Sequence, residues 1–239
     1  MKITNRLHRI FLKEVVRYKS RDESMNLWVQ HYLGTNRRYE GVKSANTRKL
    51  AKNIIYEFNP NQQQVADLIS SLYQSGTTFT EIDFAGKVLG VVKHIRPQIT
   101  PQYLDFWLDF ATGWAEVDLL CQSNFSALEI LAKWSEWKKM LIKFRRSQNI
   151  SKRRASLVLL VKATRESADP RLSKLAFSNI DILKSETTVL ITKAVSWLLR
   201  SLIYHHDYEV KNYLETHQST LPKIAYRETK KKLETGKKS

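Results

Sequence analysis

Two short stretches of the chain combine an indole ring with charged side chains at helical spacing. Trp114 and Asp118 are four residues apart, so a helix would place both on one face. Trp197 has Lys193 four residues before it and Arg200 three residues after it, which sets a ring between two cations. A carboxylate stabilises a developing positive charge, and aromatic faces flanked by cations suit a phosphate backbone. These residues are candidates for chemistry on a polyanion.

A structural explanation competes with the functional one. Tryptophans at helical spacing are usually core residues, and Asp118 could simply pair with a nearby arginine. Arg153 and Arg154 open a strongly apolar segment, so at least one of them must project away from the core. Composition alone favours the structural explanation for each residue taken singly.

The sequence lacks the common catalytic motifs GxxxxGK[ST], GxGxxG, HExxH and GxSxG. His205 and His206, followed by Asp207, are neighbours in sequence and would point different ways on a helix, which suits a single metal ion poorly. Cys121 is the only cysteine, so it can form no intrachain disulfide, and we expect it to be a small buried side chain. The sequence therefore predicts no metal site and no cofactor.

The charge balance predicts a polyanionic partner. Forty Lys and Arg against 23 Asp and Glu give a net charge of +17, which favours phosphate contacts but does not choose between DNA, RNA and an acidic membrane surface. No apolar run approaches the roughly 18–20 residues of a membrane span, and residues 1–21 carry charges throughout, unlike a signal peptide. We expect a cytoplasmic protein, which would be nucleoid-associated if its polyanionic partner is DNA.

Helices must position these candidates, because seven glycines and five prolines are too few for a turn-rich β-protein. Apolar periodicity predicts helices over residues 10–32, from Ser44 or Asn46 to Phe58, and over 62–74, 80–95, 101–110, 114–122, 126–146, 151–165, 170–183, 185–205, 208–217 and 222–233. We expect a frayed basic tail at about residues 230–239.

One segment is repeated in the second half of the chain. The run from Arg154 through Ala155 to Leu160 matches the run from Lys193 through Ala194 to Leu199, at an offset of 39 residues. A period of roughly 40 residues with two helices in each unit is typical of HEAT or armadillo repeats. The expected fold is a single all-α domain over residues 1–239, an α-solenoid of HEAT-like helical repeats with a concave basic DNA-binding face.

Five segments, in order, resemble the AlkD family of DNA alkylation repair proteins, from about Tyr32 to Glu228. Tyr32 and the later run from Gly41 to Arg48 are similar to the family's tyrosine and G-[IV]-[QK]-x-P-x-x-R, with Ala45 in place of the proline. The run from Trp114 to Asp118 resembles W-D-x-V-D, which carries the family's central tryptophan and catalytic aspartate. Gly113 stands where the family often has a second tryptophan.

The remaining three segments lie in the second half. Asn149 to Ala155 resembles N-x-W-x-x-R-A, with Ser151 in place of the tryptophan and Arg154 matching a phosphate-contacting arginine. Lys193 to Arg200 closely resembles K-A-[IV]-G-W-x-L-R, and Arg227-Glu228 resembles a terminal R-E pair. Each motif is weak alone, but five in the family's order are much stronger evidence.

The resemblance implies a DNA glycosylase of the 3-methyladenine/7-methylguanine type, a hydrolase of base excision repair that removes cationic N3- or N7-alkylated purines from duplex DNA without base flipping. It implies Asp118, Trp114 and Trp197 as catalytic residues. It implies DNA contacts from Tyr32, Lys43, Arg48, Arg153, Arg154, Lys193 and Arg200. The expected partner is double-stranded DNA containing alkylated purines, bound by a monomer, with no membrane association.

Two other functions stay open at this point. The chain could be a non-catalytic HEAT-like protein that binds branched or distorted DNA, which the departures at Gly113 and Ser151 favour. It could also be a protein-interaction solenoid whose basic groove holds an acidic peptide. Replacing Asp118 distinguishes them, because a glycosylase would lose turnover while keeping DNA affinity.

Overall fold

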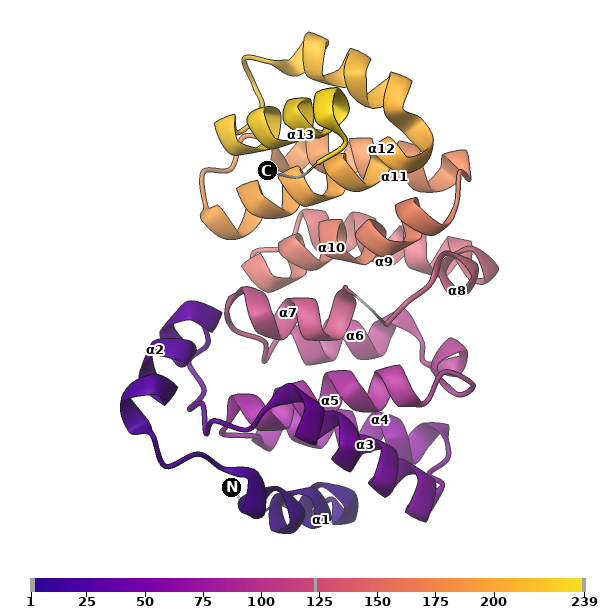
Figure 1. Cartoon of the computed structure of the whole chain (residues 1–239). Helices are drawn as coiled ribbons and strands as arrows, with labels where there is room; N and C mark the ends of the chain where they lie inside the picture. Colours follow the sequence, from indigo (N-terminus) through magenta and orange to yellow (C-terminus); the bar gives the residue numbers. More distant parts are fainter. Residues whose placement is uncertain (1–2, 123, 238–239) are drawn as a thin grey trace. The chain divides into compact units, whose positions relative to one another are not determined.

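The computed structural model describes residues 3–122 and 124–237, and these residues form α-helices joined by short connections (Figure 1). They contain no β-strand, only an isolated bridge between Arg38 and Thr78. The predicted all-α class is confirmed. The chain divides into two compact units, residues 1–120 and 121–239, and each is described by itself. The single domain over residues 1–239 and its concave basic face stay predictions.

The first unit is built around the largely buried helix α5. Both α3 and α4 pack on α5, and α1 packs on α3 and α4. Every residue of α5 from Phe79 to Leu89 is buried except Lys87, which is half-buried. The helices of this unit are α1 (Arg6–Val15), the 3₁₀ turn η1 (Val16–Tyr18), α2 (Glu23–Leu33), α3 (Ser44–Phe58), α4 (Gln62–Ser75), α5 (Phe79–Val91), the 3₁₀ turn η2 (Arg96–Gln98), α6 (Pro101–Leu108) and α7 (Gly113–Cys121).

A buried polar pair ties α1 to α5. Nε2 of His8 lies 2.7 Å from Oε1 of Glu81, and both side chains are buried. Oε2 of Glu81 accepts hydrogen bonds from the backbone N–H and the hydroxyl of Thr78, each at 2.8 Å, so the same carboxylate also caps α5. Burial raises the pKa of Glu81, but the hydrogen bonds from His8 and Thr78 outweigh it and the net shift is downward.

The second unit is organised around α10, which packs against α8, α9, α11 and α12. The repeated alanines Ala155 of α10 and Ala194 of α12 are both fully buried, and these two helices pack together. α13 covers α12 (Figure 1). The helices of this unit are α8 (Ala127–Ala132), α9 (Trp134–Arg145), α10 (Ile150–Glu166), α11 (Pro170–Leu183), α12 (Val189–His217) and α13 (Lys223–Thr235).

The predicted helices differ from the observed ones mainly at interruptions without glycine or proline. The prediction of one continuous helix over residues 10–32 is wrong. The helical segment ends with η1 at Tyr18, and a separate helix, α2, begins after Asp22, whose carboxylate caps it. The helix expected over 126–146 is broken at Lys133 (φ −119°, ψ 42°). Conversely, the helices expected over 185–205 and 208–217 form one helix, α12, which begins only at Val189 and is kinked at His206 (φ −140°, ψ 41°). The bounds expected for α11 are confirmed.

Four further predictions concern the C-terminal tail, Cys121, membrane spans and metal sites. α13 continues to Thr235, so residues 230–235 of the expected tail are helical, while residues 238–239 lie outside the described part. Cys121 is buried, as expected. No helix in the described part is both long and apolar enough to cross a bilayer, and no group of three or more His, Cys, Asp or Glu there could hold a metal ion.

Candidate nucleic-acid interface

Trp114 of α7 contacts Tyr32 of α2. The indole Nε1 of Trp114 donates a hydrogen bond to the backbone carbonyl of Tyr32 at 2.9 Å. The two rings meet edge to face, with centroids 5.6 Å apart and planes at 85°. Asp118 lies one turn further along α7 and is partly exposed. The structure thus brings together Tyr32 and Trp114, two residues that the sequence linked only through the family resemblance.

Gly113 and Gly34 make this contact possible. Both adopt left-handed backbone conformations, with φ of +67° and +64°. A Cβ atom on Gly113 would lie 1.9 Å from the carbonyl oxygen of Gly34, whereas a Cβ on Gly34 would make only ordinary van der Waals contacts, the nearest with Cδ1 of Trp114 at 3.6 Å. A tryptophan at position 113, as in the resembling family, would therefore displace the backbone that follows α2. The departure at Gly113 has a local structural cause.

A buried carboxylate, Glu116, fixes the first turn of α7. Oε2 of Glu116 accepts a hydrogen bond from the backbone N–H of Thr112 at 3.0 Å, and Oε1 accepts from the hydroxyls of Thr112 and Thr35. Nη1 of Arg37 lies 3.5 Å from Oε2, and the Glu116 side chain is fully buried. The loop after α2 is thus fastened to the helix that carries Trp114 and Asp118.

Sequence reasoning missed Glu116 and its partners. The available signal was an acidic residue in the first turn of a helix, preceded by a threonine, which is typical of N-terminal capping. The long-range partners Thr35 and Arg37 carried no comparable signal.

A second contact holds α7 in place. A Cβ on Gly86 of α5 would lie 2.7 Å from the carbonyl oxygen of Leu119, so α5 and α7 approach closely.

The other predicted contacts of the first unit lie at the start of α3. Lys43 is the residue before α3, and Arg48 lies in its second turn. Both side chains are exposed, and neither forms an ion pair among the described residues. Their charges are therefore available to a polyanion.

Arg153 and Arg154 of α10 are both engaged within the second unit. Arg153 forms a two-point pair with Glu186, Nε to Oε1 at 2.7 Å and Nη2 to Oε2 at 3.2 Å. Arg154 is buried, and its Nη1 donates a hydrogen bond to the carbonyl oxygen of Leu190 in the first turn of α12. The arginine that sequence reasoning matched to a phosphate contact thus also joins α10 to α12.

The predicted residues of α12 differ in exposure. Lys193 is exposed, Trp197 is partly exposed and Arg200 is buried. Nη2 of Arg200 lies 3.3 Å from Oε2 of Glu228, which also accepts a 2.6 Å hydrogen bond from the hydroxyl of Ser196. Burial lowers the pKa of Arg200 and the charge of Glu228 opposes that shift. Glu228, singled out as half of a terminal R-E pair, is therefore the partner of Arg200.

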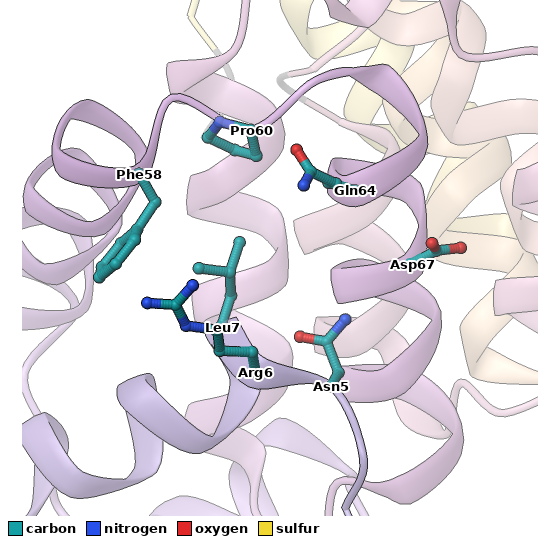
Figure 2. A pocket seen from close by; sticks show the side chains of 7 residues that line it. All are labelled: Asn5, Arg6, Leu7, Phe58, Pro60, Gln64 and Asp67. Carbon is teal, nitrogen blue, oxygen red and sulfur yellow. The ribbon is translucent and has the colours of Figure 1, made fainter.

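A small hollow in the first unit lies among residues outside the predicted set. It has a volume of about 180 Å³. Figure 2 shows the Arg6 side chain beside the Phe58 ring, and its guanidinium carbon lies 5.3 Å from the ring centroid. The lining residues are Asn5, Arg6, Leu7, Phe58, Pro60, Gln64 and Asp67. None of them is a predicted catalytic or DNA-binding residue.

Comparison with known proteins decides the family. The sequence profile described as DNA alkylation repair enzyme matches residues 18–233, which is most of the chain. The chain belongs to this family. Membership gives the chain a role in DNA alkylation repair, with DNA as what it acts on.

The fold is similar to that of a solved structure whose description also names DNA alkylation repair. A structure described as a predicted DNA alkylation repair enzyme from Enterococcus faecalis is similar with a TM-score of 0.69 and 16% sequence identity. The match covers 91% of this chain and 98% of that one. At this identity, the likeness supports the fold. A comparison with curated protein sequences gave no match.

Proposed function

We propose that the chain is a DNA glycosylase that excises cationic N3- or N7-alkylated purines from duplex DNA in base excision repair. The observation that carries the proposal is the arrangement at α7, where Trp114 is held against Tyr32 and Asp118 follows one turn later. The resemblance assigns these three positions to one site, and family membership supports alkylation repair.

The proposed reaction breaks the bond between C1′ of deoxyribose and the alkylated purine nitrogen. The bonding electron pair goes to the base, which loses its positive charge and leaves as a neutral molecule without an acid to protonate it. The sugar passes through an oxocarbenium-like state, to which water adds at C1′ with loss of a proton. The products are the free base and an abasic site, and no cofactor or metal is needed.

Asp118 would act on the sugar. A carboxylate held beside the developing oxocarbenium stabilises it electrostatically and accepts the proton of the attacking water. Trp114 and Trp197 would present their ring faces to the same positive charge. Trp114 and Asp118 belong to the first unit and Trp197 to the second, so their joint action on one deoxyribose is part of the proposal.

The DNA backbone would be held by basic residues of both units. Lys43, Arg48 and Lys193 are exposed, so we assign them the largest share of phosphate binding. Arg153, Arg154 and Arg200 belong to the proposed set as well, but each already bonds a carboxylate or a carbonyl. We expect them to contribute less affinity and more of the local order of α10 and α12. Tyr32 would contact the backbone beside Trp114.

Base flipping is not part of the proposal. A purine that already carries a positive charge is a good leaving group, so its edge need not enter a pocket that supplies an acid. The proposed enzyme therefore discriminates by charge, and we expect release of 7-methylguanine but not of uracil. Efficient uracil release would contradict the mechanism.

The test compares release of N7-methylguanine from methylated duplex DNA by the wild type, Asp118→Asn and a matched control, Asp67→Asn. Asp67 is an exposed residue of α4, and its replacement makes the same change of charge in the same unit. We expect release by the wild type and Asp67→Asn, near-loss in Asp118→Asn, and equal affinity of all three for unmethylated duplex. If no variant releases the base but all of them bind duplex DNA in a salt-sensitive way, the result would instead support a non-catalytic DNA-binding function. If no variant releases the base and all of them bind DNA only weakly, it would support a protein-interaction solenoid.

A further inference from the structure

Helix α2 turns an apolar stripe to solvent. None of its residues is buried. Met25, Trp28 and Tyr32 follow one another at spacings of three and four residues, which places them on one face of the helix. Their side chains are 55%, 63% and 60% exposed. An exposed apolar stripe of this kind usually marks an interaction surface.

Polar contacts on other faces hold α2 in this position. The side-chain amide of Asn26 donates to the carbonyl of Ser20 at 3.4 Å, and the backbone N–H of Tyr39 donates to Oε1 of Gln30 at 3.4 Å. Gly41 allows its loop to lie close to the residues that precede α2, because a Cβ on Gly41 would lie 2.2 Å from Cβ of Ser20. The stripe is therefore left exposed by a helix that is anchored through its polar residues.

The rings of the stripe are ordered with respect to one another. Trp28 and Tyr32 stack with centroids 5.7 Å apart and planes only 5° from parallel. Tyr32 in turn is fixed by the edge contact and hydrogen bond of Trp114. Trp28 and Tyr32 thus form an aromatic ledge that is continuous, within the first unit, with the proposed site.

We propose that this ledge stacks an unpaired DNA base, so that the chain prefers duplexes with a bulged or gapped nucleotide beside the bound site. The proposal rests on the proposed DNA-binding function and adds Trp28 to the residues that determine which DNA is chosen. Flat, exposed rings offer a base the π-surface that it loses when it leaves the duplex. Neither the family motifs nor the glycosylase chemistry requires Trp28.

The surrounding charge favours DNA as the occupant. Residues 17–49, which contain α2 and its anchoring loop, carry eight Lys and Arg against three Asp and Glu. A protein interface usually depletes charge around an apolar centre, whereas a stacking site for nucleic acid combines aromatic rings with a positive groove. The ledge supplies the exposed rings, and the segment that carries it has an excess of positive charge, so DNA is the occupant that we propose.

The test measures affinity for unmethylated, fluorescently labelled duplexes by anisotropy, comparing a fully paired duplex with the same duplex containing one extra unpaired adenine. The variants are Trp28→Ala, Trp28→Phe and the control Leu27→Ala, whose side chain is 67% exposed on the same helix but off the stripe. We expect the wild type to prefer the bulged duplex by about fivefold or more. Trp28→Ala should lose that preference, while Trp28→Phe and Leu27→Ala keep it.

Several outcomes would overturn the proposal. These are a wild type without preference for the bulged duplex, an equal loss in Leu27→Ala, binding to phosphatidylglycerol vesicles that Trp28→Ala abolishes, or a concentration-dependent dimer that the same variant abolishes. The excision assay separates the two levels. If Asp118-dependent release persists without bulge preference, only the ledge proposal fails; if no protein binds DNA at all, the proposed function fails as well.

Discussion

Replacing Gly113 by alanine should cost more than the same change at its contact partner Gly34. Both residues have positive φ, so each substitution brings the left-handed strain of roughly 1–2 kcal/mol. Only at position 113 does the new Cβ collide with backbone, 1.9 Å from the carbonyl oxygen of Gly34, which must move by roughly 1 Å or more. Such overpacking adds about 1–3 kcal/mol.

The expected free energies of destabilisation are therefore about 1–2 kcal/mol for Gly34→Ala and about 2–5 kcal/mol for Gly113→Ala. At about 2–4 °C per kcal/mol, the Gly113→Ala unfolding transition should fall below that of Gly34→Ala. Calorimetry or circular dichroism would measure both. The pair is a matched control, because the two glycines share one contact and differ only in what a Cβ meets.

The same substitution should impair the proposed excision reaction beyond its effect on stability. Moving Gly34 shifts Tyr32, whose carbonyl holds the Trp114 indole, and Thr35, whose hydroxyl holds Glu116. A displacement of this size near the reacting groups costs roughly 100-fold in rate. We expect that loss in release of 7-methylguanine by Gly113→Ala, assayed well below its Tm. A Gly113→Ala protein as stable and as active as Gly34→Ala would refute the reasoning.

Three further substitutions separate binding from folding. Lys193→Ala removes an exposed charge, so it should leave the Tm nearly unchanged but weaken DNA binding and lower the slope of log K against log salt by about 0.9; an unchanged slope would exclude the phosphate contact. Arg200→Ala removes the charged partner of Glu228 and leaves it only the hydroxyl of Ser196, so it should destabilise the second unit by about 1–3 kcal/mol in urea unfolding, whereas a neutral effect would mean the pair contributes nothing. The pKa of Glu81 is lowered on folding, so its contribution to stability is present above the unfolded pKa, near 4.3, and is lost as pH falls through the lower folded pKa. Glu81→Gln should remove that acid-dependent part of the unfolding free energy, which is lost as the pH falls below about 5, and an unaltered acid limb would contradict the assignment.

The fold class was predictable because the pattern of the helices is local. Pro170, capped by Asp169, opens α11 where the sequence indicates it, and apolar periodicity identifies the buried faces of α10 and α12. The interruptions were not predictable in the same way. Lys133 and His206 leave helical geometry, and neither residue is a helix breaker by type, so their conformations follow from tertiary packing.

The candidate site was only half accessible from the sequence. Helical spacing places Trp114 and Asp118 on one helix, but it carries no information that Tyr32, 82 residues earlier, holds the indole. The ion pair of Arg200 with Glu228 is likewise a tertiary fact, and it changes the expected weight of that arginine in DNA binding. Lys193 is exposed and Arg200 is buried, although the charge pattern of the sequence predicts the same phosphate-binding role for both.

The hydrogen bond from Thr35 to Glu116 spans 81 residues, and this separation has a consequence for how the chain folds as it is synthesised. Closing a loop of that length costs roughly 4 kcal/mol of chain entropy, so we expect α7 to dock after the helices between have formed and shortened the loop. Until α7 docks, Arg37 lacks its ion pair with the carboxylate of Glu116. A chain that stops short of α7 would carry Tyr32 and the aromatic ledge without the indole that orients them.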